Sequence, residues 1–375
     1  MPNPNAIVSH VLGVAPPPDR PGADERGLTV ELEEGRTVRL DPADKRAGGF
    51  ARVLDGLREL RKPVYLEVDP ATSTITRLLI PHLGRVHAVR PIDDGVLAVE
   101  LEQSQARHVL RRTTPDAAES ERALREALRT NAPVVVTETD AHEIIDVRAY
   151  KPLPDGLPHF PPFPRPEVPP FTPWSLDWIR HRLWWCWRWC WWPWWWFRCC
   201  LSSTRAQAVF NAMSATSCAP LTVPPPCIPF LYPDDGCWGR ASEMCRLMIS
   251  MGLHPKKVWI QGGLHVLTKN NPNCEVYWGW HVAPTLCVRG PRFWQSREMV
   301  IDPALFTTPV TQGAWKGVQG DPSATLTPSA ASIFYLWGSV TDPGYVQTNQ
   351  VLATYRLQLL NRSIQVGPPP YAICP

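Results

Sequence analysis

Hydrophobic and polar positions along residues 27–150 follow the pattern of a small α+β domain. Apolar residues alternate on both sides of Glu34-Gly35, which predicts a hairpin of strands Leu28–Leu32 and Thr37–Leu40. From Phe50 onward they recur every three or four residues, which predicts a helix. Alternating apolar residues predict four more strands: Val64–Val68, Arg85–Val89, Val96–Leu101 and Val134–Thr137. Helical spacing predicts a second, charged helix over Ser120–Leu128.

Residues 202–365 form a second predicted α+β domain. A helix with Cys237 in its first turn is expected, because Cys237 and the apolar residues that follow lie on one face and Gly252 is well placed to end it. Asp235 is its expected N-cap. Three further elements are predicted downstream, two strands and a closing amphipathic helix: Val276–Val288, Met299–Ile301 and Gln347–Leu360.

Proline content and polarity mark the boundaries of these domains. Residues 1–26 and 366–375 are expected to be tails, the first of them disordered. Residues 151–173 contain ten prolines, which exclude a helix or a central strand and predict an extended linker. No basic segment precedes an apolar one near residue 1, so no secretory signal is expected. The predicted location is the cytoplasm, or outside the cell by a non-classical export route.

Residues 174–201 are rich in tryptophan, arginine and cysteine. Eleven of the chain's 18 tryptophans lie between Trp174 and Trp196, interrupted by arginines. Three interpretations remain open: contact of residues 174–200 with a membrane interface, a hydrophobic strap over another domain, or a low-complexity insertion. The cysteine spacing is too irregular to favour zinc.

Composition narrows the function classes. A net charge of +3 is too small to indicate nucleic-acid binding. The chain has no charge-free apolar run of 18 residues, so it is not a conventional multi-span membrane protein. Residues 27–150 carry no phosphate loop, nucleophile pair or metal-ligand spacing, and we interpret four histidines there as ordinary surface or half-buried residues: His82, His87, His108 and His142. No metal or cofactor is expected.

The chemistry of the second domain centres on Cys237. A cysteine in the first turn of a helix lies near unpaired backbone N–H groups, which lower a thiol pKa and can stabilise an oxyanion. His281, on the predicted long strand, is the candidate base, and Asp302, at the end of the next strand, is the candidate group that orients it. This order of residue types fits a thiol nucleophile with a base and an orienting carboxylate. Each residue alone is more often structural.

Three separated motifs resemble the bacterial protein-glutaminases. The segment Cys227-Ile-Pro-Phe-Leu-Tyr-Pro-Asp-Asp-Gly-Cys237-Trp-Gly-Arg-Ala resembles their nucleophile segment, Trp280-His281-Val-Ala their histidine segment, and Ile301-Asp302-Pro-Ala-Leu-Phe with Ala314-Trp315 their aspartate segment. The resemblance covers roughly residues 202–362 and implies an α+β cysteine-hydrolase fold related to the transglutaminase core. It also implies that Cys237, His281 and Asp302 are nucleophile, base and orienting group.

The implied reaction is hydrolysis of the side-chain amide of protein-bound glutamine to glutamate and ammonia, through a thioester. The implied partners are proteins or peptides with exposed glutamine. Alternatives are a transglutaminase or a cysteine protease with the same triad, and a non-catalytic protein that binds a membrane or a partner through its Trp-rich segment. Weaker substrate-binding candidates are Trp238, Arg240 and Trp280, each of which also suits a packing role.

The role of residues 27–150 stays open at this stage. The region is acidic, the remainder of the chain is more basic, and the proline-rich linker separates them. A cover over the cleft and an independent binding or delivery module are both compatible with this pattern. The resemblance to the protein-glutaminases does not extend to this region. Its members carry a signal and a region that covers the active site, neither of which is evident here.

Overall fold

The structure is a computed structural model that describes residues 5–15, 27–151, 200–219, 221, 226–290, 292 and 295–374. It mixes helices and strands, as expected for the α+β class. The predicted linker 151–173 and Trp-rich segment 174–201 lie outside the described residues, apart from Lys151, Cys200 and Leu201. None of the described helices is long and apolar enough to cross a membrane.

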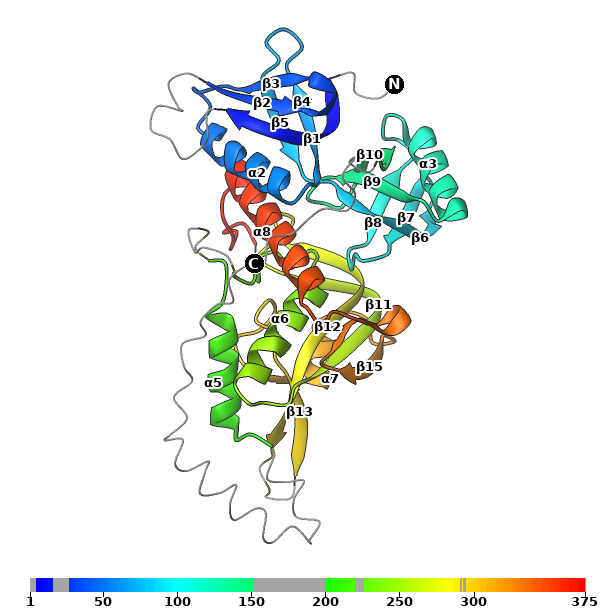
Figure 1. Cartoon of the computed structure of the whole chain (residues 1–375). Coiled ribbons are helices and arrows are strands. Elements are labelled where there is room, and N and C mark those ends of the chain that lie inside the picture. The colour runs from blue at the N-terminus through cyan, green and yellow to red at the C-terminus, as the bar shows by residue number, and fades with distance from the viewer. Residues whose placement is uncertain are drawn as a thin grey trace.

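The N-terminal region consists of two units in succession, drawn in blue and in cyan in Figure 1. Each contains a five-stranded sheet and one long helix. The first unit comprises β1 Ala6–Ala15, β2 Leu28–Leu32, β3 Thr37–Leu40, α2 Ala47–Glu59, β4 Pro63–Val68 and β5 Ile75–Leu79, with the short 3-10 helix η1 Glu33–Gly35. The second comprises β6 His82–Asp93, β7 Val96–Leu101, β8 His108–Arg111, α3 Ala117–Thr130, β9 Pro133–Glu138 and β10 Ile144–Ala149.

These two units repeat one topology. The strand orders are β3-β2-β1-β4-β5 and β8-β7-β6-β9-β10. In each unit the first strand along the chain is therefore central in the sheet, and the third and fifth strands form its edges. In each unit one isolated parallel bridge joins the third strand to the segment at the start of the fifth, Arg39 to Thr74 and Val109 to Glu143. The expected single small domain is therefore a pair of like units.

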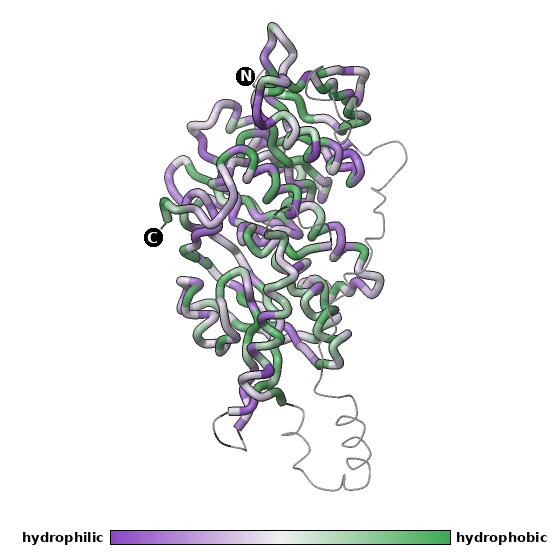
Figure 2. The backbone as a smooth tube through the Cα atoms, turned by 90° about the vertical axis from the view of Figure 1, so that its left-hand side faces the viewer, coloured by the Kyte–Doolittle hydropathy of each residue, from purple (hydrophilic) through white to green (hydrophobic). Residues whose placement is uncertain are grey.

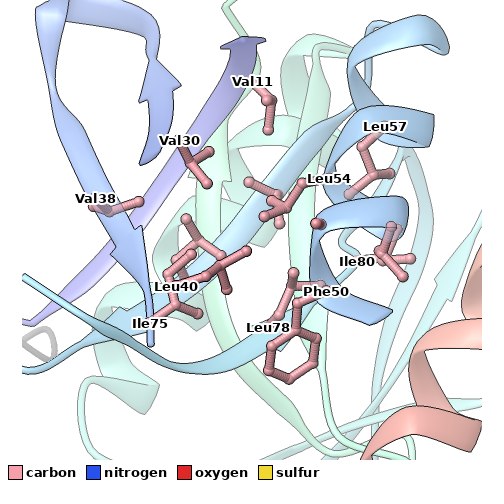
Figure 3. Packing of buried hydrophobic residues seen from close by; sticks show 14 of the residues in the cluster. Val11, Val30, Val38, Leu40, Phe50, Leu54, Leu57, Ile75, Leu78 and Ile80 are labelled. Atoms are coloured by element: carbon pink, nitrogen blue, oxygen red, sulfur yellow. The ribbon is translucent and has the colours of Figure 1, made fainter. Parts of the chain in front are cut away.

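The first unit also corrects the expected N-terminal tail. Residues 6–15 form β1, the central strand of the sheet, which pairs with both β2 and β4. Its buried residues Ile7 and Val11 belong to the hydrophobic core. Figure 3 shows Phe50, Leu54 and Leu57 of α2 packed over the sheet residues of this core. Residues 6–15 do contain the alternating apolar residues of a strand. The prolines and polar residues of 1–26 nevertheless made the whole segment resemble an unstructured tail.

The C-terminal domain is built around a five-stranded sheet in the order β14-β13-β12-β11-β15. Its two longest strands pair antiparallel along their length, with a break in register after Gln261. The domain comprises α5 Ser203–Ser214, α6 Cys237–Ser250, β11 Lys256–Leu267, β12 Glu275–Arg289, β13 Ser296–Val300, β14 Val310–Thr311, α7 Gln312–Gly317, β15 Thr325–Ala330, β16 Ile333–Tyr335, η3 Trp337–Ser339, β17 Val340–Thr341 and α8 Val346–Val366. The tube in Figure 2 shows hydrophobic stretches in both halves of the molecule.

Helix α8 links the two halves of the molecule. It packs against α6 of its own domain and against α2 of the first N-terminal unit (Figure 1). Leu357 and Leu360 of α8 belong to the core of that unit. Gly56 lets Leu357 approach α2 closely, because a Cβ at this position would lie 2.7 Å from the leucine side chain. The helix runs six residues beyond the predicted end at Leu360, because its last turns cover the N-terminal unit.

Three disulfides lie among the described cysteines, Cys200–Cys287, Cys218–Cys227 and Cys274–Cys374. The last one corrects the expected tail 366–375, since Cys374 is buried and its disulfide ties the end of the chain to the start of β12. Cys237 and Cys245, both buried in α6, are free. Disulfides are typical of proteins in oxidising compartments, while the cellular location itself stays a prediction.

Candidate active site

Cys237 is the first residue of α6 and so lies in the first turn, where the sequence predicted it. The residue before it, Gly236, adopts the left-handed conformation, and the helix has no side-chain cap. Asp235 is therefore not the N-cap that the sequence suggested. Its carboxylate accepts hydrogen bonds from the hydroxyls of Ser104 and Tyr355, at 2.6 and 2.7 Å. The first backbone N–H groups of α6 are thus left for another acceptor.

His281 and Asp302 are in direct contact. The His281 Nε2–H donates to Asp302 Oδ2 at 2.9 Å, and the indole N–H of Trp315 donates to the same oxygen at 2.9 Å. The imidazole lies between the rings of Trp278 and Trp315, with centroid distances of 4.6 and 5.4 Å. Its other nitrogen, Nδ1, is buried and has no hydrogen-bond partner among the described residues. The ring is therefore held in one orientation, with one nitrogen available as a base.

Charge and burial set the proton affinities at this pair. Burial lowers the pKa of His281, and the charge of Asp302 only partly offsets this effect. Burial works to raise the pKa of Asp302, but the charge of His281 and hydrogen bonds from His281 and Trp315 outweigh it, so the carboxyl stays ionised. A neutral imidazole beside a carboxylate is the arrangement that a general base needs.

Cys237 belongs to the same buried site. Burial raises the pKa of its thiol well above the ordinary value, while the charge of Arg240 and a hydrogen bond from the Val282 backbone N–H act in the opposite direction. Val282 follows His281 on β12, so that strand contributes to both side chains. Asp302 is close enough for its charge to influence the thiol. His281 and Asp302 are therefore in direct contact, and Cys237 contacts the residue that follows His281 on β12.

A glutamine from the N-terminal region occupies this site. The backbone N–H of Cys237 donates to Gln105 Oε1 at 2.9 Å, and Gln105 Nε2 donates to the carbonyl of Pro233 at 3.1 Å. The residue is fully buried, although it lies 132 positions before the cysteine. Both ends of the carboxamide are thus held at the start of α6, by the backbones of Cys237 and Pro233. The sequence carries no signal for this contact, since Gln105 lies in an ordinary connection between two predicted strands.

Main-chain hydrogen bonds hold Gln105 as an added strand on β12. Its N–H donates to Asp235 Oδ1 at 2.9 Å, and its carbonyl accepts from the Gly279 N–H at 2.9 Å. The Arg107 N–H donates to the Tyr277 carbonyl, and Ala106 bridges Trp278. This geometry is a short β-augmentation that inserts one side chain into the site.

Beside this strand lies a group of three histidines; His108 and His142 are buried, which corrects our interpretation of these two, whereas His82 is half-buried, as expected. One Glu138 carboxylate accepts from His82 at 2.8 Å, from His108 at 2.5 Å and from His142 at 2.8 Å. His87 remains exposed, as expected. His108 also contacts Ser104 Oγ at 3.0 Å, which connects the group to the inserted strand.

Ligand atoms of His82, His108 and Glu138 lie within 4.8 Å of one another, so these residues could also hold a metal ion. In the structure each imidazole is instead bonded to the carboxylate. The nearby Asp234 receives two hydrogen bonds from Arg362, at 2.8 and 2.9 Å. Burial works to raise the pKa of Asp234, but the charge of Arg362 outweighs it and lowers the pKa.

The weaker substrate-binding candidates take different places. The Trp280 indole N–H donates to the Ser104 carbonyl at 3.1 Å, so it contacts the inserted strand directly. Trp238 is buried with its ring 5.6 Å from that of Trp280. Arg240 is buried and donates to the carbonyls of Tyr232 and Asp235, which holds the loop before α6.

A comparison with protein-family models agrees with the motifs. Residues 206–319 match the family model described as Glutaminase. Among solved structures the chain is similar to pro-protein-glutaminase, with 19% identity and a TM-score of 0.48 over 79% of this chain and 99% of that chain. A mutant of pro-protein-glutaminase gives 22% identity and a TM-score of 0.48 over 78% and 95%. Protein-glutaminase from Chryseobacterium proteolyticum gives 26% identity and a TM-score of 0.38 over 47% and 94%.

A comparison with curated proteins gives no match. The family match lies in the C-terminal domain and includes Cys237, His281 and Asp302, the residues on which the three motifs were recognised. The C-terminal domain of this chain, which the match covers over residues 206–319, therefore belongs to the protein-glutaminase family.

Proposed function

We propose that the protein is a hydrolase that deamidates glutamine side chains of other proteins, using Cys237 as nucleophile. The observation that supports this most strongly is the carboxamide of Gln105, bound through its oxygen to the Cys237 N–H. A site that holds a primary amide at the start of a helix, beside a buried thiol, is suited to acyl transfer from that amide.

In the proposed mechanism, His281 Nδ1 accepts the thiol proton and the sulfur attacks the carboxamide carbon. The oxyanion that forms is stabilised by the Cys237 N–H. His281 then gives its proton to the departing ammonia, leaving a thioester. Water, activated by His281, hydrolyses the thioester to glutamate. Asp302 and Trp315 keep the imidazole in the required orientation throughout.

The N-terminal region is proposed to cover the site. Gln105 occupies the space that a substrate glutamine needs, and Ser104 fills the position beside Trp280. The same contacts indicate how a substrate binds: as an extended segment along β12, with its main chain held by Asp235 and Gly279. An extended binding mode favours glutamines in loops or unfolded segments.

The rival reactions differ in what receives the acyl group. The resembled fold is related to the transglutaminase core. A transglutaminase transfers the acyl group to an amine, whereas a cysteine protease cleaves the main chain. The pose of Gln105 favours the side-chain amide over the peptide bond, since the carboxamide rather than a backbone carbonyl meets Cys237.

The test uses a chain with a specific protease site introduced within residues 152–199, cleaved after folding. This protein is incubated with a glutamine-rich protein and a labelled primary amine. We expect ammonia release and glutamate at former glutamine positions, by mass spectrometry, with an intact main chain. Incorporation of most of the label would instead indicate a transglutaminase, and new chain ends a protease; either result would contradict the proposal.

A further inference from the structure

We infer that Gln105 is itself a substrate of this site, so that the chain deamidates its own N-terminal region and converts residue 105 to glutamate. This inference rests on the proposed function. It assigns a modification site to the N-terminal region, which otherwise carries only the role of a cover.

The contacts of the Gln105 side chain differ from those of a packing residue. Its carboxamide oxygen lies 2.9 Å from the Cys237 nitrogen, where an oxyanion would be stabilised, and its amide nitrogen donates to the Pro233 carbonyl. By contrast Gln103, two residues earlier, is exposed. The chain therefore offers the site one of two neighbouring glutamines.

The main chain around Gln105 is fixed on both sides. Asp235 accepts from its N–H, Gly279 donates to its carbonyl, and Tyr277 accepts from the Arg107 N–H. A reactant that is tethered and oriented in this way reacts as an intramolecular group, which removes the entropic cost of bringing it to the nucleophile. The self-reaction therefore needs no binding step.

Each step of the reaction is balanced. The Cys237 sulfur forms a bond to the Gln105 carboxamide carbon, and the carbon–nitrogen bond breaks. The thiol proton passes through His281 to the nitrogen, which leaves as ammonia. One water molecule, similar in size to the ammonia that it replaces, then breaks the thioester, yielding a glutamic acid side chain at position 105 and the free thiol. Water is the only co-reactant.

The product fits the site less well than the glutamine does. A carboxylate at position 105 would place an acceptor oxygen against the Pro233 carbonyl, where the amide had a donor. The Asp235 carboxylate lies beside the same residue and holds its backbone N–H. Burial disfavours a carboxylate that no cation pairs with, and Arg240, whose charge reaches Cys237, donates to the carbonyls of Tyr232 and Asp235 rather than to residue 105. Deamidation should therefore weaken the insertion of residues 104–107 and open the site after one turnover.

The experiment compares freshly purified full chains, wild type and Cys237→Ala, by tandem mass spectrometry of the tryptic peptide that ends at Arg107. This peptide contains both Gln105 and Gln103, so Gln103 reports spontaneous deamidation. We expect glutamate at 105, or a thioester between residues 105 and 237, in the wild type alone. An intact Gln105, or equal conversion in Cys237→Ala, overturns the inference.

The proposed function is measured in parallel on the wild-type chain cleaved within residues 152–199. Ammonia release from a glutamine-rich protein together with an intact Gln105 rejects only self-deamidation. Loss of both reactions rejects the function and the inference with it.

A second measurement tests the consequence for the cover. In full chains carrying Gln105→Glu or Gln103→Glu, the rate of Cys237 alkylation is followed relative to Cys245, the other free cysteine of α6. We expect Gln105→Glu to react at least about tenfold faster, the effect of losing roughly one buried hydrogen bond. Equal rates in the two variants would contradict the opening step.

Discussion

At the scale of single residues, Asp302 determines which nitrogen of His281 carries the proton. Its Oδ2 accepts from both His281 and Trp315. In Asp302→Asn the amide can present a donor to the imidazole and favour the wrong tautomer. We expect kcat for deamidation to fall by about 10²–10⁴-fold, as for other orienting carboxylates. Trp315→Phe is the control.

The Trp315→Phe variant keeps a ring stacked near His281 but removes one donor to Asp302, so its loss of kcat should be much smaller. Steady-state kinetics on a glutamine peptide measure both variants. Equal losses would mean that the indole N–H, and not the tautomer, determines the effect.

The sequence alone predicted the three central residues for different reasons. Cys237 could be placed because a turn followed by helical spacing locates a helix start. His281 and Asp302 could be placed on strands, but their contact depends on the pairing of β12 with β13, which local patterns do not specify. The contribution of Trp315 was present in the recognised motif but had no local chemistry to reveal it.

At the scale of elements, the start of α6 depends on Gly236. Its φ of +83° is a conformation that other residues adopt at a cost, and an added Cβ would collide with the Tyr355 ring. We expect Gly236→Ala to displace the helix start and reduce activity strongly. Gly95→Ala is the matched control, because Gly95 has a φ of +77° but nothing within 4 Å of its Cβ.

For Gly95→Ala we expect only the cost of the backbone strain, about 1 kcal/mol of unfolding free energy, with activity unchanged. Thermal unfolding and kinetics on both variants separate strain from collision. A Gly236→Ala protein with wild-type kcat would show that the contact with Tyr355 is unimportant for the nucleophile.

Most long elements were predictable, because their apolar periodicity extends over many residues. The helix at Cys237 and the strand over Val276–Val288 were predicted close to their bounds in α6 and β12. Strand β1 was missed, since its neighbouring residues resemble a tail, and no element was predicted where α5 and β11 lie. Asp235 was assigned to a cap, because its true partners, Ser104 and Tyr355, are more than 100 residues away along the chain.

At the scale of the whole molecule, protonation of the histidine group in the N-terminal region affects the stability of the folded state. Burial works to lower the pKa of His142, but Glu138 and Asp234 outweigh it and raise the pKa to about 9. The folded state therefore binds a proton that the unfolded chain releases near pH 6.5. The bound proton stabilises the folded state fully below about pH 6.5, and this stabilisation is lost as the pH rises through about 9.

We therefore expect the difference in stability between wild type and His142→Gln to shrink between pH 6.5 and pH 9. Thermal unfolding across this range measures it, with exposed His87→Gln as the control. Other groups, such as Lys257 with its pKa lowered by burial, also titrate above neutral pH, and the difference between variants removes their contribution. A pH-independent difference would rule out a protonated His142.

Sequence patterns could not predict how the N-terminal and C-terminal halves of the molecule pack together. The two N-terminal units share a topology, and the sequence marks this repetition only in short stretches such as Val-Glu-Leu-Glu at both 30–33 and 99–102. The packing of α8 on α2 and the insertion of Gln105 beside Cys237 join residues that are far apart along the chain. Local periodicity carries no information on such contacts, whereas it does predict the elements that make them.

The central claim is that Cys237 is the nucleophile of a protein-glutamine deamidase. The most direct measurement is ammonia release from a glutamine-rich protein by the chain cleaved within residues 152–199, as wild type, Cys237→Ala and Cys245→Ala. Cys245 is the matched control because it is also free and buried in α6. The account predicts wild-type release with Cys245→Ala and none above background with Cys237→Ala. Equal release from all three proteins would contradict it.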